Sequence, residues 1–292
     1  MGHFFAQQLL KSGHHVNFIL RPGQTAQPYP FIFADLQQQL SHNLVTAQSQ
    51  LTAKCDFLLV TLKAYQVLSA LTPLQDQVDK RCCIVLMHNG MGTAEKVSQL
   101  FPNNAVLIGT TSNGALKTTT DEKHVLIKHT GQGITWFGAF NNKAKRHTDI
   151  AQRLFALAEC HWSDNIRETL WLKLIINCAI NPLTAIKQCK NGALAEPENY
   201  AQVQAIVNEL SIISQKAGLP WSAAELQAQV DSVFTRTADN FSSMHQDVFF
   251  QRQTEIDFIT GYVLRVAENY QLDAPVNQRL FDQVKRLETS CD

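Results

Sequence analysis

The fold is decided by CIVLMHNGMG, residues 83–92, in which a short apolar run ends abruptly in polar residues and glycines. Side chains along a strand alternate between its two faces, so a continuous apolar run indicates a strand buried on both faces. The same pattern recurs in FLLVTLK at 57–63, in VNFIL at 16–20 and in VLI at 106–108. Helical spacing between these runs predicts an α/β domain around a mostly parallel sheet.

The second half of the chain has a different pattern. Two segments, HVLIKH at 124–129 and GITWFG at 133–138, are predicted to form an added antiparallel hairpin. Long segments with apolar residues at helical spacing then follow at 167–180, 203–217, 223–233 and 255–269. The sequence therefore predicts a Rossmann-like α/β domain over residues 1–163 and an all-helical domain over residues 164–292.

The start of the chain is unusual for such a domain. A dinucleotide-binding domain opens with a strand, a glycine-rich turn and a helix, but here the helical pattern begins at once, with Gly2 where the third glycine of the turn would fall. We expect an N-terminally truncated domain, in which 16–20 and 57–62 each expose an unpaired strand edge. Low stability and weak dinucleotide binding would follow. The alternative is a natural variant that fills this place differently.

Bulk composition excludes several classes of protein. The chain has 25 basic and 25 acidic residues and no basic block, so nucleic acid is not an expected partner. No apolar run approaches the roughly 18 residues that span a bilayer, and no signal peptide is present, so we expect a cytoplasmic protein that does not enter membranes. The seven cysteines show no C-x-x-C spacing, which predicts free thiols and no metal site.

The strongest chemical signal is ETLWLKLIINCAINPLTA, residues 168–185. Lys173, Asn177 and Asn181 stand four residues apart, on one face of a helix that is otherwise apolar nearly all round. Buried polar groups need partners, so this stripe is predicted to line a cleft. The alternative is a lysine that reaches solvent beside two structural asparagines. Pro182 is expected to end the helix near Asn181.

A second polar series lies in DNFSSMHQDVFFQRQTEID, residues 239–257. If the segment is one helix, Asn240, Ser243, Asp247, Gln251 and Glu255 share a face. An ordinary amphipathic helix explains the same spacing, and Glu255 could equally be a helix N-terminal charge.

Ligands of open α/β sheets bind at the carboxyl ends of the strands, where Arg21, Lys63, Asn89 and Thr110 stand. An arginine after the second strand of a dinucleotide domain accommodates the 2′-phosphate of NADP, whereas an acidic residue there selects NAD. No Asp or Glu lies between residues 2 and 34, which favours NADP, although Arg21 could be an ordinary surface residue. The two glycines of HNGMG allow close approach to a flat ligand, or form a common turn.

Taken together, segments in this order resemble the ketopantoate reductase family. The segments that carry the resemblance are VTLKAYQV, LMHNGMG, IGTTSNGA, NIRETLWLKLIINCAINPLTA, NGAL, NFSSM, TEIDFITGYVLR and APVNQRLFDQVK. The resemblance implies NADPH-dependent reduction of 2-dehydropantoate to (R)-pantoate, on the route to pantothenate and coenzyme A. It implies an active site between a dinucleotide domain and a helical domain.

The resemblance also implies roles for individual residues. Lys173 matches the general acid, and Glu255 matches a glutamate at the nicotinamide and substrate end. The residues matching substrate-binding positions are Asn177, Asn181, Asn191, Asn240 and Ser243. The residues matching cofactor-binding positions, besides Glu255, are Gly2, Arg21, Lys63, Asn89 and Ala115.

Two other functions fit the same residues. The missing glycine-rich turn suggests a non-catalytic fragment or scaffold of this fold, whereas the intact polar stripe of Lys173 speaks against one. A related reductase of another 2-keto acid is the third hypothesis. Nothing in the sequence indicates the oligomeric state.

Overall fold

A computed structural model describes residues 1–21, 23–51, 54–120, 124–148 and 159–289. The chain forms two compact units. The first comprises Met1–His88 and Thr93–Ile166, and the second comprises Asn89–Gly92 and Arg167–Asp292. The short piece Asn89–Gly92 thus belongs with the helices, although it follows a strand of the first unit. The binding roles expected of residues 1–163 and 164–292 stay a prediction.

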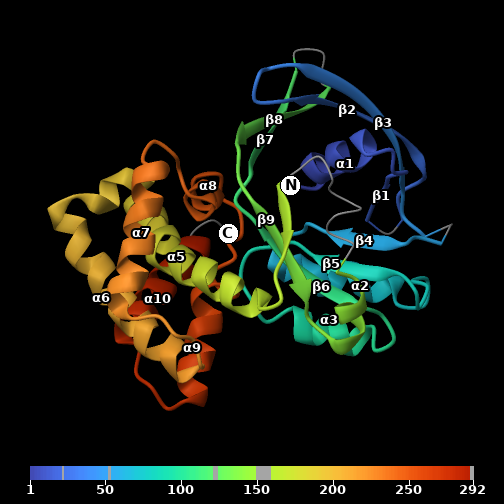
Figure 1. Cartoon of the computed structure of the whole chain (residues 1–292). Coiled ribbons are helices and arrows are strands. Elements are labelled where there is room, and N and C mark those ends of the chain that lie inside the picture. The colour runs from blue at the N-terminus through green and yellow to red at the C-terminus, as the bar shows by residue number, and fades with distance from the viewer. Residues whose placement is uncertain (22, 52–53, 121–123, 149–158, 290–292) are drawn as a thin grey trace. The chain divides into compact units, whose positions relative to one another are not determined.

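The first unit contains two five-stranded sheets (Figure 1). One has the order β1 (Asn17–Ile19), β3 (Leu40–Gln48), β2 (Gln27–Ala34), β8 (Val125–Gly131) and β7 (Gly114–Thr119). The other has the order β10 (Cys160–Trp162), β9 (Thr135–Ala139), β6 (Val106–Thr111), β5 (Cys83–Leu86) and β4 (Phe57–Val60). The α/β class is confirmed. The mostly parallel arrangement is confirmed for the predicted strands that became β4, β5 and β6, which pair in parallel within the second sheet. It is wrong for segment 16–20, because β1 lies in the other sheet.

Two strand edges match the expectation for segments 16–20 and 57–62. Among the described residues, β1 pairs only with β3, and β4 pairs only with β5. Each is therefore the outer strand of its own sheet, with one row of backbone groups outside any ladder.

The hairpin expected from 124–129 and 133–138 is wrong. These segments become β8 and β9, which lie in different sheets. β8 pairs antiparallel with β7, while β9 pairs antiparallel with β6. The prediction paired these two segments because they are neighbours in sequence. In the structure each pairs instead with a strand that precedes it in the chain. The antiparallel pair β2 and β3 was not predicted at all.

Helices cover the second sheet on both faces. The helices concerned are α1 (Gly2–Lys11), α2 (Val67–Leu71) and α3 (Ala94–Leu100). Along β5, Cys83 and Val85 belong to the apolar cluster that contains α1, whereas Ile84 and Leu86 belong to the cluster that contains α2 and α3. All four are fully buried, as the continuous apolar run predicts for a strand covered on both sides. α1 also packs against β2 and β3 of the first sheet.

The second unit is helical, as predicted. Its α-helices are α5 (Ile166–Lys187), α6 (Pro197–Lys216), α7 (Ala223–Arg236), α8 (Ser243–Phe249), α9 (Thr260–Asn269) and α10 (Pro275–Thr289). The 3-10 helix η4 (Asn191–Ala195) connects α5 to α6. Trp171, Leu174 and Ile175 of α5 lie in the core of this unit.

Two of the helix boundaries that differ from the prediction affect the predicted site residues. α5 continues through Pro182 to Lys187. Proline removes one backbone N–H, but the turns around Pro182 are buried in the core, and tertiary packing outweighs the local cost. The segment 239–257 is not one helix, because α8 ends at Phe249 and Gln251 has a left-handed φ of 53°. Glu255 therefore lies in the loop before α9.

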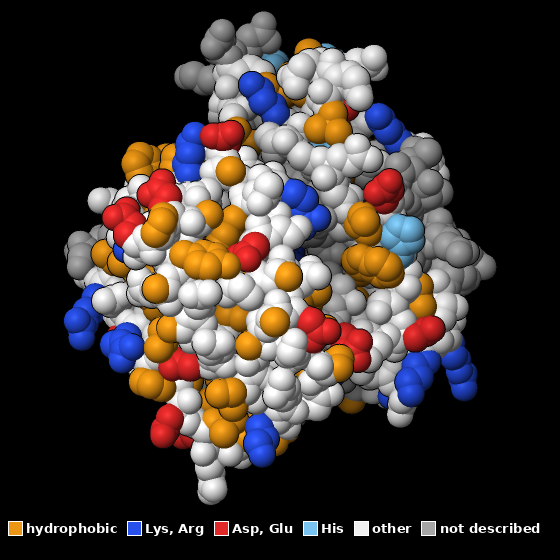
Figure 2. Space-filling model, turned by 60° about the vertical axis from the view of Figure 1, so that its left-hand side comes forward, with side chains coloured by type: hydrophobic (Ala, Val, Ile, Leu, Met, Phe, Trp, Pro, Cys, Tyr) orange, Lys and Arg blue, Asp and Glu red, His pale blue; other side chains and the backbone are white. Residues whose placement is uncertain are grey.

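α5 is long and apolar enough to cross a membrane by length and composition alone. The expectation that no apolar stretch approaches this length is therefore wrong for α5. In this structure 61% of its apolar window is buried inside the protein, as in the core helix of a globular domain. On the face drawn in Figure 2, acidic and basic side chains are interspersed.

Candidate active site

The polar stripe of α5 is the centre of the candidate site. Lys173 and Asn177 are half-buried and Asn181 is buried, between core residues of the same helix. A rise of about 1.5 Å per residue spreads the three side chains over roughly 12 Å along the axis. The stripe therefore offers one ammonium and two amides along one face of the helix.

The Lys173 ammonium has an unusual pKa. Burial lowers the pKa of Lys173 from 10.5 to about 8, and the negative charge of Glu255 opposes that decrease. A lysine with this pKa remains mostly protonated near neutral pH, yet releases its proton far more readily than an exposed one. This combination suits a proton donor.

Glu255 is held by a residue that is distant in sequence. Its side chain is only 3% exposed, and Asn89 Nδ2 donates a hydrogen bond to Glu255 Oε2 at 3.2 Å. The loop HNGMG thus meets the loop before α9 through two side chains that were singled out separately from the sequence. A buried carboxylate with an amide donor on one side and a lysine charge nearby is strongly oriented.

The loop that carries Glu255 is anchored from α10. Thr254 donates to Glu288 Oε1 through both its backbone N (2.8 Å) and its Oγ1 (2.7 Å). Lys285 in turn bridges Glu288 at 2.8 Å and Asp257 at 3.0 Å. Sequence reasoning missed these residues, because nothing in the spacing connects Thr254 with a glutamate 34 positions later.

The glycines of HNGMG let this loop approach another segment of the protein closely. Gly90 has a φ of 79°, and a Cβ there would lie 2.4 Å from the Phe258 carbonyl oxygen. Met91 N donates to that same oxygen at 2.8 Å. A Cβ on Gly92 would lie 3.2 Å from the Tyr262 ring. These glycines let the loop lie against the segment 258–262, which brings Asn89 to Glu255.

Asn191 and Asn240 form a second polar group. Asn191 N donates to Asn240 O at 3.0 Å, and Asn191 Nδ2 donates to Thr237 Oγ1 at 2.9 Å. The Oδ1 of Asn191 is buried and has no hydrogen-bond partner among the described residues. A buried acceptor of this kind fits a ligand hydroxyl. Asn240 itself is exposed.

Ser243 opens α8 and is exposed, while its neighbour Ser242 ties that helix to α5. Ser242 Oγ accepts from His245 N at 3.0 Å and lies 2.7 Å from Thr184 Oγ1. The structure therefore fixes the position of Ser243 relative to the polar stripe through a buried hydroxyl pair.

The first unit holds the other predicted cofactor residues. A Cβ on Gly2 would lie 2.8 Å from Thr61 Oγ1, so a larger residue at the start of α1 would require the Thr61 side chain to move. Lys63 follows two residues later and precedes the 3-10 helix η1 (Ala64–Gln66). Gly2 and Lys63 thus lie at the same end of β4, the carboxyl end, where ligands of open α/β sheets bind; their role in cofactor binding stays a prediction.

Arg21 and Ala115 lie on other elements of the first unit. Arg21 is exposed just after β1, with its side chain at the surface. Ala115 is half-buried on β7, at a register irregularity between Gly114 and Ala115.

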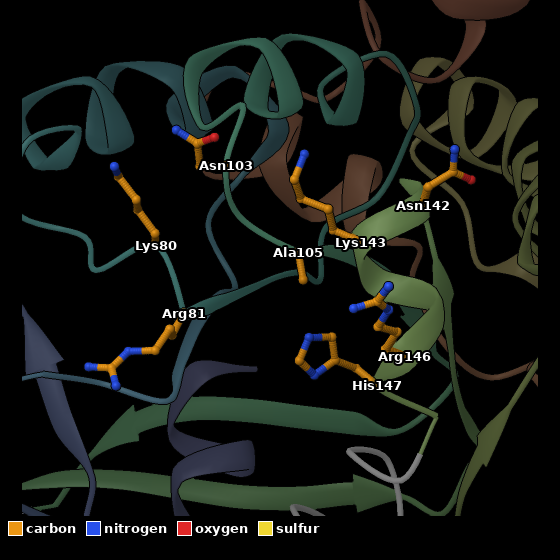
Figure 3. Close-up of a pocket in the computed structure, with 8 residues that line it drawn as sticks. All are labelled: Lys80, Arg81, Asn103, Ala105, Asn142, Lys143, Arg146 and His147. Carbon is orange, nitrogen blue, oxygen red and sulfur yellow. The ribbon is translucent and has the colours of Figure 1, made fainter.

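A hollow of about 490 Å³ lies elsewhere in the first unit (Figure 3). Its lining residues precede β5 and β6 or belong to the 3-10 helix η3 (Asn142–Arg146) and its end, and they are Lys80, Arg81, Asn103, Ala105, Asn142, Lys143, Arg146 and His147. The hollow is basic and contains none of the predicted site residues. It is at the amino ends of β5 and β6, opposite the ends that lead to Asn89 and Thr111.

Comparison with protein families matches both units. Residues 1–142 match the model described as ketopantoate reductase PanE/ApbA, and residues 165–288 match its C-terminal model. The chain belongs to the ketopantoate reductase family.

In the part of the chain that the structure describes, no group of three His, Cys, Asp or Glu side chains gathers as metal ligands do.

Relatives in the family share the whole length. The chain is similar to 2-dehydropantoate 2-reductase of Vibrio cholerae, with 41% identity over 99% of this chain and 95% of that protein. It is 36% identical to the enzyme of that name from Salmonella typhimurium, over 99% of this chain and 92% of that protein.

Solved structures share the fold. D-mandelate dehydrogenase with NADH and anilino(oxo)acetate superposes with a TM-score of 0.86 at 23% identity, over 100% of this chain and 96% of that one. A probable 2-dehydropantoate 2-reductase from Bacillus subtilis gives 0.77 at 27% identity, over 94% and 92%.

Proposed function

We propose that this chain reduces 2-dehydropantoate to (R)-pantoate with NADPH. The observation that carries the proposal is Lys173, a half-buried lysine on an apolar helix with a pKa of about 8, close to the charge of Glu255. Full-length identity to enzymes named 2-dehydropantoate 2-reductase supports the choice of substrate.

The residues of the first unit fit a dinucleotide. Gly2 allows α1 to begin against β4, and the first turn of α1 contains no acidic side chain. The free N–H groups of a helix N-terminus bind pyrophosphate. The exposed guanidinium of Arg21 is available to a 2′-phosphate, which favours NADPH. When bound, the reduced nicotinamide supplies a hydride to C2 of the keto acid.

Lys173 does the acid chemistry in this proposal. Negative charge develops on the ketone oxygen during reduction, and a positioned ammonium stabilises that charge and donates the proton. The negative Glu255 keeps Lys173 protonated, because it raises a pKa that burial lowers. Asn89 holds Glu255 in place through the 3.2 Å hydrogen bond.

The amides orient the substrate. Asn177 and Asn181 follow Lys173 along one helix face and can bond the hydroxyl and carboxylate of the ligand. The buried Oδ1 of Asn191 accepts from a ligand hydroxyl, and Ser243 with Asn240 contacts the carboxylate.

Six described cysteines are free thiols, which supports the proposal that the enzyme works in the reducing cytoplasm.

A substrate and cofactor panel tests the proposal. Purified chain is given NADPH or NADH with 2-dehydropantoate, pyruvate or phenylglyoxylate, and cofactor oxidation is followed by absorbance. The proposal expects the highest kcat/KM for 2-dehydropantoate with NADPH. A preference for phenylglyoxylate would instead indicate an activity like that of the structurally similar mandelate dehydrogenase. No turnover with any pair, in a chain that melts cooperatively, would support a non-catalytic scaffold.

A further inference from the structure

Two cysteines of the first unit lie in direct contact, at the amino ends of two paired strands. Cys55 Sγ and Cys82 Sγ are 3.2 Å apart. Cys55 stands two residues before β4 and Cys82 one residue before β5. These strands pair in parallel, and Cys83 N donates to Asp56 O at 2.8 Å. The contact therefore lies where two paired strands begin.

The geometry suits a covalent bond. Neighbouring strands lie about 4.8 Å apart, and disulfides join Cα atoms about 4.4–6.8 Å apart. A change of roughly 1.2 Å in the sulfur separation brings the two atoms to the S–S bond length of about 2.0 Å. Rotation about the Cα–Cβ bonds supplies such a shift, with little demand on the backbone.

The two thiols differ in access and in acidity. Cys82 is fully buried, whereas Cys55 is half-buried and reachable from solvent. The hydrogen bond from Cys82 lowers the pKa of Cys55 to about 7, against the opposing effects of burial, Asp56 and Asp79. The same contact and burial raise the pKa of Cys82. Cys55 is thus the attacking thiolate in the first step, and Cys82 supplies the second nucleophile.

We propose that Cys55 and Cys82 form a reversible oxidative modification site, at which a peroxide converts the thiol pair into an intramolecular disulfide. The Cys55 thiolate attacks one peroxide oxygen, so that an S–O bond forms, the O–O bond breaks and hydroxide leaves. The Cys82 sulfur then attacks the Cys55 sulfur, so that the S–S bond forms, the S–O bond breaks and water leaves with the Cys82 proton. The two sulfurs lose two electrons, and hydrogen peroxide is reduced to one water and one hydroxide, which becomes the second water by taking a proton from solvent.

The remaining cysteines give matched controls. Cys160 and Cys189 are also half-buried, but burial raises the pKa of each, to about 11 for Cys160. Cys83 is next to Cys82 in sequence but points into the cluster around α1 rather than the one around α2. None of these three is placed to form the same pair.

Peptide mapping tests the site directly. The folded chain is treated with hydrogen peroxide, its free thiols are blocked, and it is digested with trypsin. Cleavage after Lys54 and Arg81 gives peptides 55–63 and 82–96, which the proposal expects to be joined and to separate on reduction. Cys83→Ser should keep the link, and Cys82→Ala should abolish it. Unlinked peptides, a link that survives Cys82→Ala, or a link only between two molecules would overturn the proposal.

A second measurement does not depend on the disulfide. At pH 7 a thiol of pKa about 7 is about half ionised, so Cys55 should react with iodoacetamide about tenfold faster than Cys189 in the reduced protein. Cys82→Ala should remove most of that advantage, whereas Cys82→Ser, which keeps a hydrogen-bond donor, should retain part of it. Equal rates for Cys55 and Cys189 would contradict the activated thiolate.

Discussion

Replacing Lys173 by methionine tests the assignment of the proton donor. Methionine keeps the length and apolar stem of the side chain, so α5 should retain its packing while the ammonium is lost. With a pKa of about 8, about nine-tenths of Lys173 is protonated at pH 7, so the wild type has nearly its full acid strength there. We expect Lys173→Met to lower kcat by about 10²–10⁴, the usual contribution of a general acid, or about 2.7–5.4 kcal/mol of barrier.

The assay is NADPH oxidation with saturating 2-dehydropantoate, beside thermal melting of each variant. Lys187→Met is the matched control, because Lys187 is an exposed lysine in the last turn of the same helix. It should keep kcat within about twofold, since exposed changes away from a site have small effects. A Lys173→Met protein that melts like the wild type and keeps near-normal kcat would refute the role of Lys173.

The remaining predictions concern pH, cofactor choice and the loop glycines. In the reduction direction kcat/KM should decrease about tenfold per pH unit above about 8, because the protonated acid is present only below its pKa. Glu255→Gln should move this decrease to lower pH, because the carboxylate raises the pKa of Lys173. A decrease that begins at the same pH in Glu255→Gln would exclude an effect of Glu255 on Lys173. Arg21→Ala should weaken NADPH binding about tenfold or more and NADH binding little, because only NADPH has the 2′-phosphate; equal losses by titration would show that Arg21 does not contact it. Gly90→Ala should lower the melting temperature more than Gly13→Ala. Both positions have a left-handed φ, which costs about 1–2 kcal/mol for alanine. Of the two, only Gly90 has backbone atoms within 4 Å of the new Cβ.

The order of an α/β half and a helical half could be predicted from apolar patterns alone. Cys83, Val85, Ile84 and Leu86 are apolar because β5 is covered on both faces, and that requirement is visible in the sequence. The division into two sheets could not be predicted. Apolar spacing within a segment indicates a strand, but it does not show which distant strand will pair with it. β8 illustrates this, because it pairs with β7 on one side and β2 on the other.

The site residues that lie on one helix could be predicted from the sequence. The site residues that lie on loops were much harder to predict. Lys173, Asn177 and Asn181 follow from helical spacing within α5. For Glu255 the spacing left two placements open, on the helix of 239–257 or at the start of the next helix, and the structure places it in the loop between α8 and α9. The left-handed Gln251 that breaks the segment is not a residue type that signals a break. The hydrogen bond from Asn89 to Glu255 joins residues 166 positions apart, and only the folded structure reveals it.

Isotope transfer tests the central proposal most directly. The purified 292-residue chain is incubated with 2-dehydropantoate and NADPH that has deuterium at the transferred position, and the product is examined by mass spectrometry and chiral chromatography. The proposal predicts (R)-pantoate with one deuterium on C2 and an equal amount of NADP formed. Pantoate without deuterium, the opposite enantiomer, or no product from a folded chain would contradict it.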